Sequence, residues 1–400
     1  MMESKSRRSA LLSRGQLRLL IWVLPVVILL LSLLGPESQP EAVISADSDR
    51  RIYQQVIPQQ TLFRLHLIAP HPPALDASTQ LRQRLITQAC IMRLQKPDEL
   101  GDWLSAQGWE VQVQSNAGYR LLQLKSGRPF ADSDVRQLLQ QLQTPPTVDW
   151  SALLQRTQAE QYMMRQNAEV WLASPPSSNE HLSLDPLADY ARQLQPSDWR
   201  ITLTGPEYQS LSSVIFDPAP SSAPFEDLML SPKPLPVTPA ANAQLQLHRW
   251  TLPQVKSIQD FAQLLLGREL VVQPLSRWLK QQLADAPAHQ AGYSLRWEAT
   301  QSGGLVTLLL QGEQWPEIPA WLPQQLQPEN VETARQTLLK QLEGNTGQQQ
   351  WMDLLALYQL PPDSLQRLPT QLEVLELSAM QQWLQSQLLS DYYHTLSLPH

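Results

Sequence analysis

The same order of expected elements occurs twice along this chain of 400 residues, once on each side of a stretch rich in proline and serine. That stretch is residues 216–240, and its composition is typical of an interdomain linker. Each side begins with a strand, continues with helices, returns to a two-stranded hairpin and ends with further helices. The repeated order predicts an α+β fold of two similar tandem domains, each a mainly antiparallel sheet covered by helices.

The first of these domains is expected over residues 51–215, where hydrophobic periodicity and turn residues divide the chain into short elements. Pro97 and Gly108 mark the two ends of one helix, and Gly118 marks the hairpin turn. The expected elements are strand 62–69, helices 75–94 and 97–108, strands 109–115 and 119–126, helices 132–142 and 150–171, and strand 199–204.

The second domain is expected over residues 241–400 and repeats that order with a longer first helix. Its hairpin turns at residues 301–303, and the last ten residues are either a final strand or a frayed tail. The expected elements are strand 245–250, helix 258–284, strands 293–299 and 304–310, and helices 319–326, 328–342, 348–358 and 370–388.

The amino terminus carries a membrane signal. Leu19 to Leu34 is uncharged and apolar, close to the lower limit for a spanning helix. Basic residues precede this run and acidic residues follow it, so the positive-inside rule places residues 1–18 in the cytoplasm as a basic tail. We expect a single transmembrane anchor over 19–35, a linker over 36–50, and a body in the periplasm. A cleavable signal peptide is the alternative, although no small-x-small cleavage site directly follows the apolar run.

Composition excludes several function classes. Formal net charge is -7, and removing the first 40 residues leaves 25 basic against 35 acidic side chains, which argues against a nucleic-acid-binding body. The single cysteine, Cys90, excludes an internal disulfide framework and a cysteine-rich zinc site. No glycine-rich nucleotide loop and no Gly-x-Ser-x-Gly serine motif occurs. Cys90 lies among apolar residues and is expected to be a buried thiol, not a nucleophile, and no cofactor is expected.

Three segments carry a resemblance to a known family. They are LGDWLSAQGWEVQVQSNAGYRLLQLKS (100–126), WRITLTGP (199–206) and LSRWLKQQLADAPAHQAGYSLRW (275–297) followed by GGLVTLLLQG. Their order and spacing resemble the insulinase/pitrilysin zinc peptidases, which include mitochondrial processing peptidase, over residues 52–389. The resemblance implies the two-domain half of a clamshell chamber.

The zinc chemistry of that family is missing. Its catalytic members bind zinc through a His-x-x-Glu-His helix and a more distant Glu, with the motif Glu as general base. The matching slot here, Leu81 to Cys90, contains neither His nor Glu, and the motif occurs nowhere in the chain. Glu160 falls near the place of the distant ligand but is expected to be a solvated helix residue. The resemblance therefore implies a degenerate member that is not an enzyme and holds no metal.

The family also holds substrate with an Arg and a Tyr from its second half. Tyr293 matches the Tyr by the resemblance, while the Arg position falls near Ala284. Arg277 is one or two helical turns away from that position, and Arg296 is a weaker candidate on the strand. Tyr293 and Arg277 are thus weak substrate-binding candidates. An ordinary strand aromatic packed on a neighbour is the alternative for Tyr293.

Three functions remain open. The first is a membrane-anchored, non-catalytic subunit that pairs with a zinc-bearing peptidase paralogue to form a heterodimer. The second is a stand-alone peptide- or protein-binding module on the same fold. The third is an active hydrolase with an unrecognised site using His66, His71 and Glu160, for which one helix face offers no usual ligand geometry.

Overall fold

A computed structural model of the chain describes most of residues 43–399. The described ranges are 43–71, 77–95, 99–116, 118–163, 186–194, 199–209, 211, 243–285, 292–312, 315–343, 348–389 and 393–399. The expected anchor (19–35) and the expected interdomain linker (216–240) lie outside these ranges. Within the described part of the chain, no helix is both long and apolar enough to cross a membrane.

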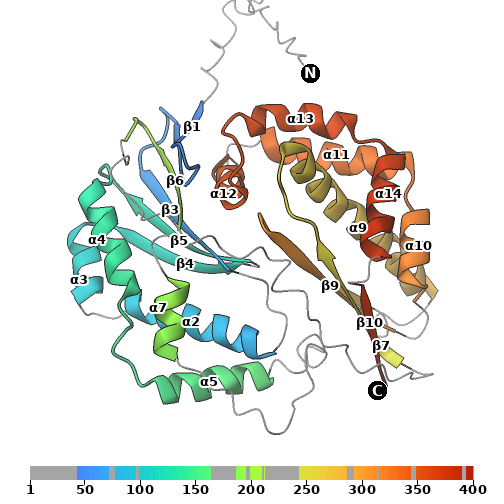
Figure 1. Cartoon of the computed structure of the whole chain (residues 1–400), viewed down its shortest axis with the longest axis horizontal. Coiled ribbons are helices and arrows are strands. Elements are labelled where there is room, and N and C mark those ends of the chain that lie inside the picture. Colours follow the sequence, from blue (N-terminus) through green and yellow to red (C-terminus); the bar gives the residue numbers. More distant parts are fainter. Residues whose placement is uncertain are drawn as a thin grey trace, which may run out of the picture. The chain divides into compact units, whose positions relative to one another are not determined.

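A six-stranded sheet is built from the first half of the chain (Figure 1). Its strand order is β1-β2-β6-β3-β5-β4, and all neighbours are antiparallel except β2 and β6, which run parallel. The strands are β1 (Ile44–Ala46), β2 (Ile52–Val56), β3 (Phe63–Pro70), β4 (Glu110–Asn116), β5 (Tyr119–Ser126) and β6 (Arg200–Gly205). The helices of this half are α2 (Ala77–Gln95), α3 (Glu99–Ala106), α4 (Asp132–Gln143), α5 (Trp150–Met163) and α7 (Pro186–Gln193).

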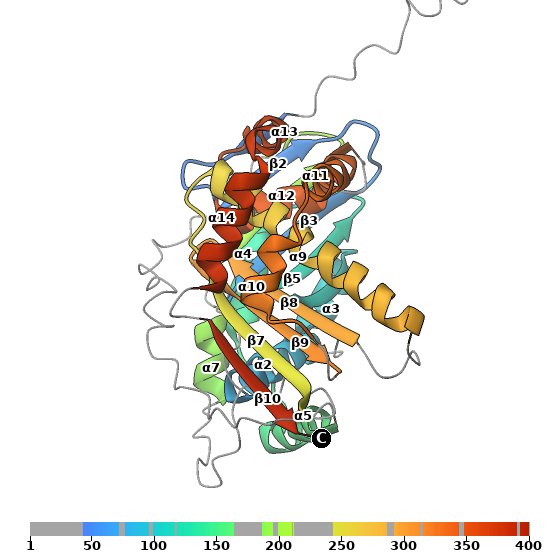
Figure 2. The same ribbon diagram turned by 90° about the vertical axis from the view of Figure 1, so that its right-hand side faces the viewer.

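A second sheet of four antiparallel strands is built from the second half, in the order β10-β7-β9-β8 (Figure 2). Its strands are β7 (Ala243–Leu252), β8 (Gly292–Thr300), β9 (Gly303–Gln311) and β10 (His394–Pro399). The helices are α9 (Ile258–Asp285), α10 (Ile318–Gln324), α11 (Pro328–Glu343), α12 (Gln348–Tyr358), α13 (Ser364–Val374) and α14 (Leu377–Leu388).

The two sheets share one connectivity. In each, the opening strand lies between the closing strand and the second strand of the hairpin, and the first hairpin strand is at the edge. This order is β6-β3-β5-β4 in the first sheet and β10-β7-β9-β8 in the second, with all these neighbours antiparallel. The last ten residues therefore supply the closing strand, β10, which settles the choice left open by the sequence.

Both faces of the first sheet are covered, and the two faces belong to different cores. Leu65 and Leu67 of β3 pack with the helices of the first half. Ile68, which alternates with them, belongs to the core that the second half builds. Helix α12 of the second half lies against β3 and β6 and provides this cover (Figure 1). Double coverage explains why residues 65–69 are buried without interruption.

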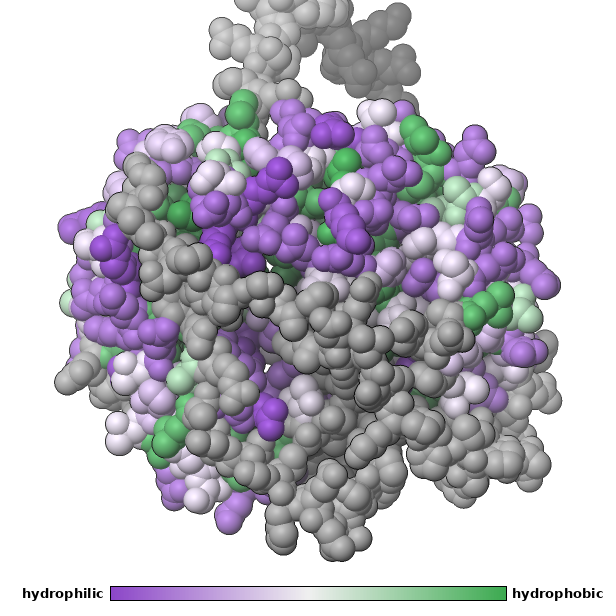
Figure 3. Space-filling view, viewed as in Figure 1, coloured by the Kyte–Doolittle hydropathy of each residue, from purple (hydrophilic) through white to green (hydrophobic). Residues whose placement is uncertain are grey.

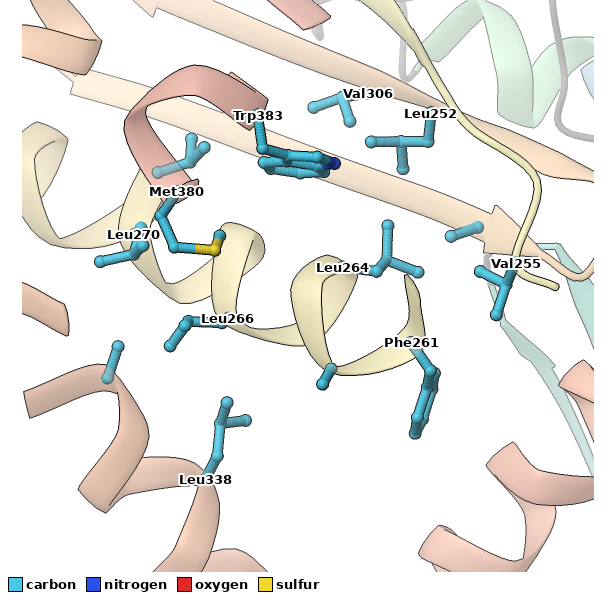
Figure 4. Close-up of a cluster of buried hydrophobic side chains, with 14 of the residues drawn as sticks. Leu252, Val255, Phe261, Leu264, Leu266, Leu270, Val306, Leu338, Met380 and Trp383 are labelled. Carbon is cyan, nitrogen blue, oxygen red and sulfur yellow. The ribbon is translucent and has the colours of Figure 1, made fainter. Parts of the chain in front are cut away.

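The second core centres on α9, which crosses the four-stranded sheet (Figure 4). Trp383 of α14 lies over α9, next to Leu252 and Val306 of the sheet. Gly267 makes this approach possible, since a Cβ at that position would lie 2.2 Å from a Trp383 ring carbon. The bare backbone of α9 is thus a packing surface for the indole.

Several elements differ from the sequence-based expectation, and helix α7 was not expected at all. The stretch 36–50, expected to be a linker, contains β1, which pairs with β2, and β2 was itself not expected. The helix expected over 370–388 is instead two helices, because Leu375 and Glu376 are extended between α13 and α14. The Arg335 guanidinium donates to the carbonyls of Leu372 and Leu375 at this break, at 3.0 and 3.2 Å, and so satisfies the end of α13.

On the face drawn in Figure 3, the described surface is predominantly hydrophilic. In Figure 3, green hydrophobic side chains stand singly or in small groups among purple ones. The most exposed large hydrophobic residues of the described chain are spread along its length, as ordinary protein surfaces show. They are Val43, Leu62, Met92, Leu187, Tyr208, Val374 and Leu389.

Candidate functional site

Helix α2 contains residues 81–90, the stretch that matches the zinc-binding helix of the insulinase/pitrilysin peptidases by the resemblance. Half of this stretch is apolar, and these residues face the first core, with Leu85, Ile86 and Ala89 fully buried. Cys90 is also fully buried, and burial raises the pKa of its thiol to about 12. The thiol is therefore neutral at physiological pH. A nucleophilic cysteine needs a thiolate, so Cys90 is a packing residue.

The polar group that this stretch of α2 turns toward the sheet is Thr87. Its hydroxyl accepts a hydrogen bond of 3.0 Å from Nε of Arg120, the second residue of β5. A second guanidinium nitrogen of Arg120 donates to the amide oxygen of Gln193 on α7. Arg120 is fully buried, and that burial lowers the pKa of its guanidinium to about 10, so it carries its charge at pH 7.

Two arginines of α2, Arg82 and Arg84, are also charged. Arg82 forms an ion pair of 2.8 Å with Asp189 of α7, whose carboxylate is almost completely buried. Arg84 has a lowered pKa, because it is half-buried and because Arg296 of β8 acts on it electrostatically. Arg84 thus brings α2 into electrostatic range of the second half of the chain.

Zinc does not fit this helix. The Thr87 hydroxyl accepts a hydrogen bond from the Arg120 guanidinium, and a neighbouring positive charge opposes metal binding. Across the described ranges, no group of three His, Cys, Asp or Glu side chains is placed to hold a metal ion. The whole sequence contains no His-x-x-Glu-His. This stretch of α2 therefore lacks zinc ligands, and it also lies beside a positive charge that would repel a metal cation.

Glu160 lies on α5, which packs against α2. Its carboxylate accepts a 2.9 Å hydrogen bond from Arg156, four residues earlier on the same helix, and its side chain is 43% exposed. A pair of this kind is a common surface feature of helices and contributes little to stability. Glu160 also contributes to the electrostatics of Arg84, which confirms only that α5 and α2 are neighbours at this point.

The two substrate-binding candidates come from neighbouring elements. Tyr293, on β8, is half-buried, and its hydroxyl lies 2.6 Å from the Ser276 hydroxyl on α9. Arg277 follows Ser276 directly, and its side chain is exposed. Arg296, also on β8, is paired with Glu298 of the same strand. Ala284, the position at which the family Arg was expected, belongs to α9, but its side chain lies outside the described residues.

A buried polar cluster joins the two halves of the chain, and sequence reasoning did not find it. His66 Nδ1 lies 2.8 Å from Asp353 Oδ2, and Thr202 donates to the other carboxylate oxygen at 2.5 Å. Gln349, one turn before Asp353 on α12, donates to Thr202 at 2.8 Å and accepts from Thr204 at 2.8 Å. All five side chains are buried. Each of the five side chains forms a hydrogen bond with a residue of the other half of the chain, and buried polar groups normally have such partners.

This cluster separates His66 from the other members of the hydrolase hypothesis. The imidazole of His66 is committed to Asp353, which lies in the other half of the sequence. His71 follows β3 and donates its backbone N–H to Gly118 at 2.8 Å, while Glu160 lies on the surface of α5. No sequence pattern indicates Asp353 as a partner, because it lies 287 residues from His66 on a helix with an apolar majority.

Comparison of the sequence with known protein families finds no match, and no curated protein matches. Solved structures do match. The inactive domain of a peptidase M16 from Pseudomonas fluorescens superposes with a TM-score of 0.57 at 14% identity, over 89% of this chain and 98% of that one. The chain has the M16 peptidase fold. A protease from Helicobacter pylori shares it, with a TM-score of 0.55 at 10% identity over 90% of this chain and 100% of that one.

The same M16 fold occurs in a periplasmic protease, PqqL from Escherichia coli, with a TM-score of 0.52 at 14% identity. The match covers 92% of this chain and 48% of PqqL. The predicted resemblance to the insulinase/pitrilysin family is thus confirmed at the level of fold. On this fold the chain carries no zinc motif, and one of the matching structures is itself described as an inactive domain.

Proposed function

We propose that the chain is a membrane-anchored, non-catalytic peptidase-like protein of the periplasm that pairs with a zinc-bearing M16 relative. The observation that carries this proposal is Arg120, which bonds to Thr87 within the stretch of α2 where catalytic members carry their zinc ligands. A fold kept without its metal chemistry is suited to shaping a chamber and binding substrate while another chain cleaves it. The resemblance of the body to both an inactive M16 domain and a periplasmic protease supports this division of labour.

The anchor and the tandem domains are part of the same proposal. The apolar run 19–35, with basic residues before it and acidic residues after it, supports a single span with a periplasmic body. The order β6-β3-β5-β4 in one sheet and β10-β7-β9-β8 in the other supports domains at 51–215, extended at its start by β1, and at 241–400, joined by residues 216–240. Limited proteolysis of the full chain should then cut first within 216–240, and an early cut inside either sheet would contradict these boundaries.

The test of the pairing is an affinity purification of the tagged full chain from solubilised membranes. We expect a second chain that bears His-x-x-Glu-His to co-purify in near-equal amount. A control bait consisting of residues 1–50 fused to the same tag should bring down none of it, because the pairing surface belongs to the body. Recovery of the same chain by the control bait would mean that the membrane segment, not the M16 fold, makes the contact.

Two other outcomes would replace this function. If the full chain purifies alone but binds peptides, it is a stand-alone binding module on the M16 fold. If the purified chain contains one zinc per molecule and cleaves peptides by itself, both non-catalytic proposals are wrong. Zinc analysis and a peptide-cleavage assay on the same preparation distinguish these outcomes from the heterodimer.

We further propose that Tyr293 and Arg277 contribute weakly to substrate binding. Ser276 fixes the Tyr293 hydroxyl, and Arg277 extends into solvent one residue along α9, so both are positioned on neighbouring elements. Arg277→Ala should weaken peptide binding by the reconstituted pair about threefold, as the loss of an exposed charge does. Lys280→Ala, which removes another exposed cation of α9, is the matched control, and an equal loss there would make the effect one of net charge alone.

A further inference from the structure

Arg120 is a buried charge whose protein partners are all neutral. The side chain is fully buried, and its two hydrogen-bonded nitrogens donate to the Thr87 hydroxyl and the Gln193 amide oxygen. The third nitrogen, Nη1, is buried without any hydrogen-bond partner. No carboxylate of the described chain bonds to this guanidinium. A buried cation left in this state costs several kcal/mol, so proteins seldom tolerate one.

A second unsatisfied donor lies in the same place. Tyr190, on α7, is fully buried, and its hydroxyl has no hydrogen-bond partner. Cys90 and Tyr190 both affect the pKa of Arg120, and Cys90, Arg93 and Arg120 all affect the pKa of Tyr190, so these groups are neighbours. Burial raises the pKa of both the Tyr190 phenol and the Cys90 thiol, so neither supplies a negative charge at pH 7. Three elements, α2, β5 and α7, thus enclose the uncompensated charge of Arg120 and two donors without acceptors.

We propose that a small inorganic anion of about the size of chloride binds between α2, β5 and α7, held by Arg120 Nη1 and the Tyr190 hydroxyl. An anion accepts hydrogen bonds from both donors and neutralises the guanidinium in one step. A metal cation would be repelled by the same charge. A water molecule would satisfy the donors but leave the charge uncompensated. Because both side chains are fully buried, a peptide or another large ligand does not reach the two donors.

The first test compares thermal unfolding of the full chain in sodium chloride and in sodium gluconate at equal ionic strength. Wild type should gain several degrees in Tm as chloride rises from about 1 to 100 mM, since a ligand that binds only the folded state stabilises it. Tyr190→Phe keeps the ring and removes one donor, so its chloride-dependent shift should fall by half or more. Arg120→Gln should abolish the shift.

The control is Arg156→Gln, which removes a cation that is exposed on α5. This variant should keep the full chloride dependence. An equal shift in wild type, Tyr190→Phe and Arg156→Gln would mean a general salt effect and would overturn the proposal, as would the absence of any chloride-specific shift. Tyr190→Phe keeps the test decisive if Arg120→Gln does not fold.

The second test locates the ion. Crystals of the full chain grown with sodium bromide in place of chloride should show an anomalous bromide peak within about 3.5 Å of Arg120 Nη1. A peak of ordinary density without anomalous signal would identify a water molecule and would overturn the proposal. Because the site belongs to the folded chain alone, this result is independent of whether a zinc-bearing partner exists.

Discussion

The Nδ1 atom of His66 lies 2.8 Å from the Oδ2 atom of Asp353, although 287 residues separate them in the sequence. His66 belongs to β3 in the first sheet, and Asp353 belongs to α12 of the second half. Thr202 and Gln349 complete the hydrogen bonds of the Asp353 carboxylate. The two halves of this M16 fold therefore meet through a satisfied polar contact inside an apolar interface, and both should unfold together.

Removal of this carboxylate should destabilise the whole body. Asp353→Ala removes the partner of His66 Nδ1 and one hydrogen bond each of Thr202 and Gln349, all of them buried, so we expect the free energy of unfolding to fall by about 3 kcal/mol. Urea unfolding followed by tryptophan fluorescence and circular dichroism measures the change. Asp363→Ala is the control, because its pair with Arg367 is more than half exposed and should contribute about 0.5 kcal/mol or less.

The double variant isolates the pair. His66→Ala combined with Asp353→Ala should cost at least about 1 kcal/mol less than the sum of the single changes, because the two side chains are in direct contact. Additivity within about 0.3 kcal/mol would mean that the contact does not couple the halves.

Gly267 should not accept a side chain. Gly267→Ala places a Cβ 2.2 Å from a Trp383 ring carbon, so α9 and α14 must move apart. We expect a loss of about 2 kcal/mol in the free energy of unfolding, even though alanine favours helices more than glycine does. Gly127→Ala is the matched control, since its Cβ would meet nothing within 4 Å, and its effect should stay within about 0.5 kcal/mol.

A measured gain in stability for Gly267→Ala would contradict the packing of Trp383 on α9. The tryptophan emission spectrum of the same variant gives an independent check. An indole displaced toward solvent should shift that spectrum to longer wavelength.

His248 should make the fold sensitive to acid. Its imidazole is buried, with Nδ1 2.5 Å from the Tyr393 hydroxyl, and burial lowers its pKa to about 4 from an ordinary value near 6.5. The unfolded chain takes up a proton near pH 6.5 that the folded chain does not accept until about pH 4. The contribution of neutral His248 to the free energy of unfolding is therefore fully present above about pH 6.5. About 3 kcal/mol of it is lost as the pH falls toward 4.

The measurement is the free energy of unfolding between pH 7 and pH 4 for wild type and His248→Gln. The variant should be the less stable protein at pH 7, but its stability should fall less steeply as the pH drops. Parallel pH profiles for the two proteins would show that another group causes the acid sensitivity.

Cys90 should report on opening of the first core. The thiol is fully buried, and its pKa is raised to about 12, so iodoacetamide should not modify the folded chain at pH 8 over hours. In urea above the unfolding midpoint, modification should reach completeness within minutes. Because Cys90 is the single cysteine of the chain, mass spectrometry of the intact protein reads the reaction directly. Rapid labelling of the folded protein would place this stretch of α2 at the surface.

Much of the element order is readable from the sequence, because periodicity is a local property. The strand 62–69 and the hairpin around Gly118 appear as β3, β4 and β5 within one or two residues of the expected bounds. The break between α13 and α14 was missed, since the carbonyls there are satisfied by Arg335, which lies about 40 residues earlier. β1 and β2 were missed because they have only three and five residues, and so short a strand has little hydrophobic pattern of its own.

The sequence by itself determined that the chain lacks His-x-x-Glu-His and that its halves repeat one order of elements. Both follow from residue identity and local periodicity, which folding does not change. Only the tertiary structure decided which side chains contact the stretch of α2 that matches the family's zinc motif, and which side chains join the two halves. Arg120 meets Thr87 across 33 residues and His66 meets Asp353 across 287, and such contacts depend on how sheets and helices pack. The local sequence pattern predicts the strand or helix on which each of these residues lies. It does not predict which other strand or helix packs against that element.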